Sequence, residues 1–130
     1  AMRAVTAGLA LAKTLGAKAT AVVVRVPLRE FVAEGVTIPI PESTRQDYIK
    51  QTDQLLESTR VAAKSAGVAL DTVQKVDEEP WRGIIGTAKD KGCDLIVMAS
   101  HGRRGVSALL LGSETQKVLT HSVVPVLVYR

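Results

Sequence analysis

The sequence predicts an α/β domain in which an open, mostly parallel sheet of four strands carries helices on both faces. Short β-branched or wholly apolar stretches alternate with amphipathic stretches, and glycine or proline stands at most boundaries between them. The 130 residues, 46% of them hydrophobic, suffice for one domain over residues 1–130. The expected helices are residues 2–15, 43–66, 80–91 and 113–120, and the expected strands are residues 20–26, 68–76, 95–99 and 123–129.

The chain opens with an expected helix and an expected strand. Apolar residues recur at helical spacing over residues 2–15, and Gly16 supplies the usual helix stop in a left-handed conformation. Residues 20–26 are β-branched and nearly continuous in apolar character, which is typical of a strand covered on both faces. Pro27 ends this strand.

The middle of the chain combines an expected crossover, a long helix and an edge strand. Proline and glycine break the pattern of residues 27–42, which predicts a long irregular crossover at the carboxyl end of the preceding strand. Apolar residues on one side of residues 43–66 predict a helix that packs on the sheet and ends at Gly67. Alternation over residues 68–76 predicts a strand near a sheet edge.

Two further helices and two short apolar strands are expected in the last third of the chain. Pro80 is suited to a helix start. Trp81 lies on the apolar face of that helix and is expected to be a packing residue. The strands at residues 95–99 and 123–129 are apolar throughout, as in buried parallel sheets. His121 is interpreted as a helix-end residue.

Composition argues against several functional classes. The net charge of +4 comes from 17 basic and 13 acidic residues spread over the chain, without a basic block and with few aromatics, so no nucleic-acid partner is expected. No stretch reaches the length of a membrane span, and no signal peptide is visible, so a soluble cytoplasmic protein is expected. The lone Cys93 is interpreted as a packed thiol without chemistry.

The most informative segment is a glycine-bearing loop between the third strand and the last helix. Gly102, Gly105 and Gly112 allow close approach of backbone N–H groups to a phosphate. The helix start at Ser113 offers unpaired N–H groups and partial positive charge, and the hydroxyls of Ser113 and Thr115 could add donors. The spacing fits neither a Walker loop nor a Gly-x-Gly-x-x-Gly motif at a first strand, so another kind of phosphate site is predicted.

Alternative interpretations exist for several of these residues. Arg103 and Arg104 form a basic pair that could face phosphate, or they could be solvated loop arginines. Ser113 with Gln116 three residues later fits a capping box, which would give the serine a structural role, and both roles can hold at once. His101 is expected to hold the turn by hydrogen bonds and not to act in catalysis.

The order of these residues resembles that of a known family. Ala-Ser-His-Gly at residues 99–102, nine further residues, Gly112-Ser113 and the terminal Pro-Val-Leu-Val are similar to the universal stress protein family, whose ATP-binding members carry Gly-x-x-Gly, nine residues and Gly-Ser/Thr. The resemblance covers nearly the whole chain. It implies a Rossmann-like fold of the adenine nucleotide alpha hydrolase type and an ATP site, with Mg²⁺ accompanying the ATP.

The resemblance also implies roles for individual residues. Met98 and Ala99 would lie by ribose and adenine, Val26 would neighbour adenine, and Gly102 would approach the phosphates. The helix start at residues 112–115 would close around the phosphates. The complete set of expected cofactor-binding residues is Val26, Met98, Ala99, Gly102, Arg103, Gly112, Ser113, Glu114 and Thr115.

The sequence departs from the family pattern in two places. Ala99 stands where the first glycine is expected, and its Cβ could crowd the ligand unless the backbone angle there is ordinary. The family's first, central strand, with its adenine- or ribose-binding aspartate, has no counterpart ahead of the first helix. Ala1 before Met2 suggests a cloning remnant, so an N-terminally truncated domain is expected, either from a start codon placed too far downstream or by natural truncation.

The absence of a central strand predicts how the sheet must close. Unpaired backbone groups are costly when buried, so the strands at residues 20–26 and 95–99 are expected to pair directly, or a segment of another subunit is expected to fill the space.

Function is expected to lie in binding. No metal-ligand, nucleophile or paired acid–base constellation is visible, so association linked to nucleotide is favoured over catalysis, with slow ATP hydrolysis as the most that the residues would support. The alternative is an interaction module whose glycine loop stays empty. In either case a homodimer is expected, partly through the edge strand Val124–Tyr129.

Overall fold

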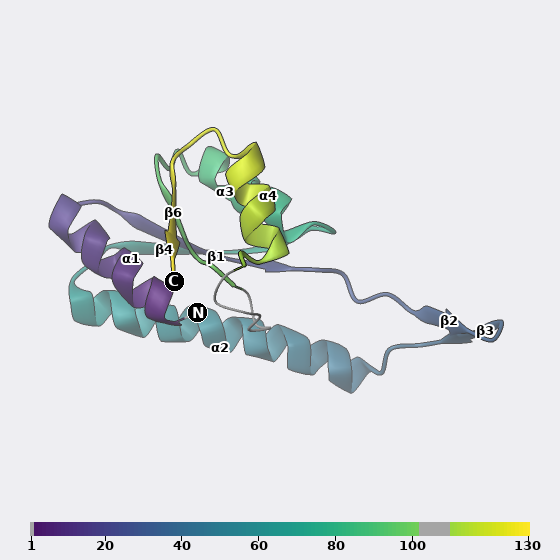
Figure 1. Ribbon diagram of the computed structural model, residues 1–130. Helices are drawn as coiled ribbons and strands as arrows, with labels where there is room; N and C mark the ends of the chain where they lie inside the picture. Colours follow the sequence, from purple (N-terminus) through teal and green to yellow (C-terminus); the bar gives the residue numbers. More distant parts are fainter. Residues whose placement is uncertain (1, 102–109) are drawn as a thin grey trace.

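The computed structural model of the protein describes residues 2–101 and 110–130, and its elements follow the predicted α/β alternation (Figure 1). The four long or medium-length helices and the parallel strands appear where the sequence patterns predict them. The elements in this part of the chain are α1 (Met2–Leu15), β1 (Ala19–Arg25), β2 (Phe31–Ala33), β3 (Val36–Ile38), α2 (Glu42–Ala66), β4 (Leu70–Val76), α3 (Pro80–Asp90), β5 (Ile96–Ala99), α4 (Ser113–His121) and β6 (Val126–Tyr129).

The parallel strands form two separate pairs. β1 pairs with β4 with Val22 opposite Val73, and β5 pairs with β6 with Met98 opposite Val128. The expectation that the strands at residues 20–26 and 95–99 pair directly is wrong, because in the described residues β1 and β5 are not hydrogen-bonded neighbours. Helix packing, not backbone hydrogen bonding, therefore joins the two halves within this single chain. The other expectation, a segment from another subunit between them, stays a prediction.

Helices cover both faces of this arrangement, as expected. α1 contacts α2, β5 and β6, while α3 contacts β1, β4 and α4 (Figure 1). α1 packs closely on β5, since a Cβ placed on Gly8 would lie 3.3 Å from Val97 Cγ1. α3 packs closely on β1, since a Cβ on Gly83 would lie 2.8 Å from Val24 Cγ2. Each helix layer thus has a contact with a different strand pair.

The buried apolar residues form two clusters that follow the two strand pairs. One contains Leu9, Ala63 and Val68 and lies between α1, α2 and the β1–β4 pair. The other contains Ala88, Ile96 and Val118, with Trp81, Met98 and Cys93 packed around it, and joins α3 and α4 to the β5–β6 pair. The predictions that Trp81 and Cys93 are packing residues are confirmed by this second cluster.

The segment expected to be an irregular crossover, residues 27–42, instead contains a β-hairpin. β2 and β3 pair antiparallel, with Phe31 opposite Ile38. Glu34 and Gly35 form the two-residue turn, with φ of 51° and 76°. Positive φ at both central residues matches the right-handed twist of the flanking strands, which is why such turns favour hairpins. The three-residue strands are too short to be detected from periodicity, and prolines stand on both sides of the hairpin.

α2 ends before the glycine at which the sequence predicts its stop. Gly67 follows its last residue in the left-handed conformation, with φ of 71°, and its N–H reaches the carbonyl of Lys64, as the sequence predicts. β4 pairs only with β1 among the described strands, which confirms its predicted place at an edge. None of the helices in the described ranges is long and apolar enough to cross a membrane.

Candidate functional site

The predicted phosphate-binding segment joins the end of β5 to the start of α4. The Gly112 N–H donates to the carbonyl of Ser100 at 2.8 Å, and the Thr115 hydroxyl donates to the carbonyl of Ala99 at 3.0 Å. These two bonds hold the first turn of α4 against the last residues of β5. The structure therefore brings together the two ends of the predicted loop, whose sequence separation is large.

The N-terminus of α4 has no side-chain cap. Gly112 is the N-cap residue, in an extended conformation with φ of −62° and ψ of 152°, and it has no side chain with which to cap. The predicted capping box is wrong: the Gln116 amide donates to the carbonyl of Leu111, 3.0 Å away, and not to Ser113. The first N–H groups of a helix have no partner within the helix and carry partial positive charge. The start of α4 thus has no side-chain acceptor for its first N–H groups.

Ala99 occupies its position without strain. It is the last residue of β5, and Glu34 is the sole non-glycine residue with positive φ in the described ranges, so the backbone at Ala99 does not require glycine. Its neighbour Met98 packs against the cluster around Ile96 and Val118. The departure from the family pattern at Ala99 is therefore compatible with the local backbone.

Ser100 and His101 form the turn that follows β5. The Ser100 N–H donates to the carbonyl of Tyr129, which continues the β5–β6 pairing by one bond. The Ser100 hydroxyl lies 3.1 Å from His101 Nδ1. This contact fits the expectation that His101 holds the turn. Its Nε2 is buried and has no hydrogen-bond partner among the described residues.

Two side chains expected at the phosphates are engaged elsewhere in the protein. The Glu114 carboxylate accepts a hydrogen bond from the Trp81 N–H, 2.8 Å away, at the start of α3, and Lys117 Nζ lies 3.9 Å from its other oxygen. The Thr115 hydroxyl is used by Ala99. Both side chains therefore make their hydrogen bonds within the protein. The link from Glu114 to Trp81 could not be read from the sequence because it joins two helices.

Val26 lies on the other half of the molecule. Its N–H donates to the Tyr48 hydroxyl oxygen at 3.1 Å, and Arg45 Nη1 donates to the Leu28 carbonyl at 2.9 Å. Within the described residues, no hydrogen bond joins Val26 to β5 or α4. The structure therefore does not bring Val26 to the loop by direct bonding. Tyr48, which holds this segment, lies in α2, within the helix that the sequence predicts over residues 43–66.

The remaining predicted residues fall outside the described part of the chain. Gly102 and Arg103 belong to residues 102–109, as do Arg104 and Gly105. Among the residues that are described, no cluster of three or more histidine, cysteine, aspartate or glutamate side chains could hold a metal ion. The arrangement that can be described is an uncapped helix end beside the carboxyl end of β5, with a buried histidine nitrogen in the adjoining turn.

A sequence profile of the Universal stress protein family matches residues 1–130. The chain belongs to the universal stress protein family. Among curated members, it is 35% identical over 89 residues to universal stress protein YxiE of Bacillus subtilis (strain 168), covering 68% of this chain and 60% of that protein. The match thus spans less than two thirds of that relative's length. The family resemblance carried by the loop motif is confirmed.

Solved universal stress protein structures share the fold. UspA from Lactobacillus plantarum superimposes with a TM-score of 0.76 at 22% identity, covering 99% of this chain and 88% of that one. A universal stress protein in complex with cAMP superimposes with a TM-score of 0.72 at 22% identity, covering 98% and 87%. These likenesses establish the Rossmann-like α/β fold of this universal stress protein domain, which confirms the predicted fold class.

Proposed function

We propose that this universal stress protein domain binds an adenine nucleotide, ATP in the first instance, at the loop between β5 and α4. The observation that carries the proposal is the uncapped N-terminus of α4, held beside the end of β5 by the Thr115–Ala99 and Gly112–Ser100 hydrogen bonds. Such a helix end favours phosphate through its free N–H groups and its dipole. A fold relative solved with cAMP supports an adenine nucleotide as the ligand.

The proposed roles of the residues follow from what their atoms are free to do. Backbone N–H groups of Ser113, Glu114 and Thr115 face the phosphates, and the Ser113 hydroxyl adds a donor. The Gly112 N–H is bonded to the Ser100 carbonyl, and Gly112 contributes the close approach that a residue without a side chain allows. Gly102 and Arg103 approach the phosphates from the other side of the loop, and Mg²⁺ accompanies the nucleotide. Met98 and Ala99 lie on the ribose and adenine side. Val26 follows β1, which belongs to the other strand pair, so it contacts the adenine only if the β1–β4 and β5–β6 pairs lie close together.

The biological role that we propose is nucleotide-linked association in a stress response, in the cytoplasm, by residues 1–130 acting as one domain.

The test is calorimetric titration of ATP into the protein and into two variants at position 113. Ser113→Asp puts a negative charge in the first turn of α4, which stabilises the helix but repels phosphate. Ser113→Asn is the neutral control of similar size. We expect ATP affinity to fall at least about tenfold in the aspartate variant, with the asparagine variant close to the parent. No heat at millimolar ATP, and no adenine absorbance in material released from the purified protein, would rule the proposal out.

A second candidate function is association without nucleotide, through the edge of β6. Among the described strands, β6 pairs only with β5, so its other edge is open within the chain, and Leu127 on it is 44% exposed. The test is light scattering after gel filtration of the parent and of Leu127→Lys, with and without ATP. A dimer that Leu127→Lys disrupts equally in both conditions supports this candidate, whereas one that appears only with ATP supports nucleotide-linked association.

A further inference from the structure

The β2–β3 hairpin is an apolar arm with two unlike faces. Cross-strand partners share a face, and residues two apart on a strand do as well. Phe31, Ala33, Val36 and Ile38 therefore lie on one face, and Val32 and Thr37 lie on the other. Phe31 is 57% exposed and Val36 is 62% exposed. We call the first face, with its four apolar residues, the arm face.

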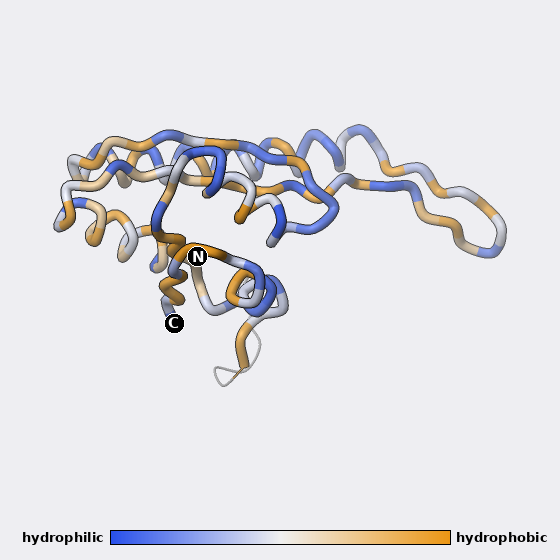
Figure 2. Tube along the Cα trace, turned by 90° about the horizontal axis from the view of Figure 1, so that it is seen from above, coloured by the Kyte–Doolittle hydropathy of each residue, from blue (hydrophilic) through white to orange (hydrophobic). Residues whose placement is uncertain are grey.

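This arm projects from the body of the molecule into solvent. In two views at right angles it extends beyond the end of α2 (Figures 1 and 2). Figure 2, which is coloured by hydropathy, shows several hydrophobic stretches along it. An isolated two-stranded hairpin is at best marginally stable in water and needs a further layer to pack against. The turn at Glu34 and Gly35 nevertheless specifies the hairpin through its backbone angles. A defined hairpin with an uncovered apolar face indicates a docking element.

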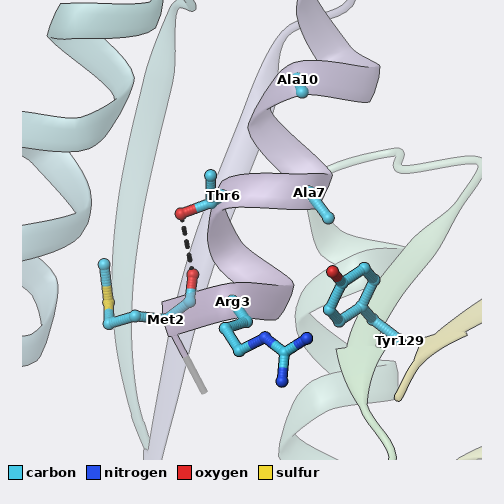
Figure 3. Close-up of a pocket in the computed structure, with 6 residues that line it drawn as sticks. All are labelled: Met2, Arg3, Thr6, Ala7, Ala10 and Tyr129. Atoms are coloured by element: carbon cyan, nitrogen blue, oxygen red, sulfur yellow. Dashed lines mark hydrogen bonds between the residues drawn. The ribbon is translucent and has the colours of Figure 1, made fainter.

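The same chain carries a surface that could receive such an arm. One side of α1 and the end of β6 line a shallow pocket of about 380 Å³, with Met2, Ala7, Ala10 and Tyr129 as its less polar walls (Figure 3). The small alanine side chains leave room above the helix for larger apolar groups. We call this surface the α1–β6 groove.

Charge matches the arm to the α1–β6 groove. Glu34 lies at the tip of the arm and Glu30 directly before β2, and neither takes part in an ion pair in the described part of the chain. At the groove, the Arg3 guanidinium lies 5.9 Å from the centre of the Tyr129 ring, toward which it points in Figure 3. Opposite charges around apolar surfaces favour one register of contact over others.

We propose that the hairpin arm docks in the α1–β6 groove of a second copy of this chain. The arm cannot reach the groove of its own chain, because it points away from the part of the molecule where α1 begins and the C-terminus lies (Figure 1). A twofold axis would place each arm in the groove of the other copy, so that two equal contacts form at once. Reciprocal exchange matters because stable interfaces need roughly 1,200–2,000 Å² of buried surface, and two contacts supply twice the area of one.

The first test compares two valines of the same hairpin by sedimentation velocity over a range of protein concentrations. Val36→Thr removes apolar surface from the arm face, and Val32→Thr makes the same change on the opposite face, where Val32 is 69% exposed. Threonine keeps the branched side chain that strands favour. We expect association at least about tenfold weaker for Val36→Thr and nearly unchanged for Val32→Thr. A monomer at every concentration, or equal effects of the two changes, would overturn the proposal.

The second test locates the contact by disulfide formation between copies. In a Cys93→Ser background, one preparation carries Val36→Cys and another carries Ala10→Cys, and the two are mixed under mild oxidation. The proposal predicts cross-linked dimers in the mixture and far fewer in either preparation alone, whereas Val32→Cys mixed with Ala10→Cys should react slowly. Rapid cross-linking of Val36→Cys with itself would show arm-to-arm packing and overturn the groove as the docking site. No cross-link in the mixture would overturn it as well.

A charge exchange then tests the register. Arg3→Glu should weaken association, and adding Glu34→Arg to that variant should restore it, because the proposed pair is re-formed with its signs reversed. Restoration fails if the two residues lie in different contacts. An unchanged dimer in all arm and groove variants, together with its loss in Leu127→Lys, would assign association to the β6 edge instead.

Discussion

The hydroxyl of Thr115 donates a hydrogen bond to the backbone carbonyl of Ala99 over 3.0 Å and so ties the first turn of α4 to the end of β5. Thr115 is only 2% exposed, so water cannot readily replace the bond if it is lost. Because the two residues stand on either side of residues 102–109, this bond sets the distance between the two ends of the candidate site. Its loss should therefore affect both stability and nucleotide binding.

We expect Thr115→Val to lower the free energy of unfolding by roughly 1–3 kcal/mol, because it leaves the Ala99 carbonyl without its donor in a buried place. Urea denaturation followed by circular dichroism measures the change. Thr120→Val is the matched control, since its hydroxyl bonds the Gln116 carbonyl at 2.9 Å on the exposed side of the same helix. Equal losses of unfolding free energy in the two variants would show that the Thr115 hydrogen bond stabilises the protein no more than an exposed one.

Two glycines of α3 make a second pair of predictions. A Cβ at Gly83 would lie 2.8 and 2.9 Å from the two methyl groups of Val24, whereas a Cβ at Gly86 would meet nothing within 4 Å. Gly83→Ala should thus force α3 away from β1 and cost about 1–3 kcal/mol, less the gain in helix propensity. Gly86→Ala should stabilise the protein by up to about 1 kcal/mol. Thermal denaturation of both variants checks the difference, and a stabilised Gly83→Ala would contradict the close packing.

The ring of His121, at the end of α4, stacks on that of Trp81 in α3, with centroids 4.5 Å apart and an interplanar angle of 23°. His121→Ala should lower the free energy of unfolding by about 0.5–1.5 kcal/mol more than the loss of buried side-chain area alone would. It should also change the fluorescence emission of Trp81, the single tryptophan of the chain. His121→Phe keeps an aromatic ring and should retain most of the stability and most of the Trp81 emission of the parent protein. Unaltered Trp81 fluorescence in His121→Ala would exclude the stack.

The pH dependence of stability should carry a contribution from Asp71. The hydrogen bond and charge of Lys18, whose Nζ lies 2.9 Å from the carboxylate, lower the pKa of Asp71 below its usual value. A lowered pKa in the folded state means that the contribution is present above the unfolded-state pKa of about 3.9 and is lost as the pH falls through the folded-state pKa.

Lys18→Gln should raise the pKa of Asp71, as measured by NMR titration of its carboxyl carbon. The acid branch of the stability curve should become less steep as a result. Lys91→Gln is the control, because its Nζ lies 4.0 Å from Asp71 and its charge is the smallest of the causes that lower the pKa. An equal rise in both variants would refute the primary role of Lys18.

Local signals in the sequence determined the helices, the parallel strands, the edge position of β4 and the stop at Gly67. These features depend on side-chain period and on backbone angles within a few residues, and both are written in neighbouring positions. The loop motif at residues 99–113 also pointed to the family, which the profile match over residues 1–130 establishes. What stays a prediction is the nucleotide.

Only the tertiary structure decided how those elements meet. The carboxylate of Glu114 caps the start of α3 at Trp81, the Val26 N–H bonds Tyr48, and β1 and β5 remain in separate pairs, all through contacts between residues far apart in the chain. The sequence pattern does not predict the hairpin at residues 31–38, because a two-residue turn with Glu34 in the left-handed region carries no strong local signal. Long-range contacts depend on which surfaces are left to bury once the local elements have formed, and that is a property of the whole fold.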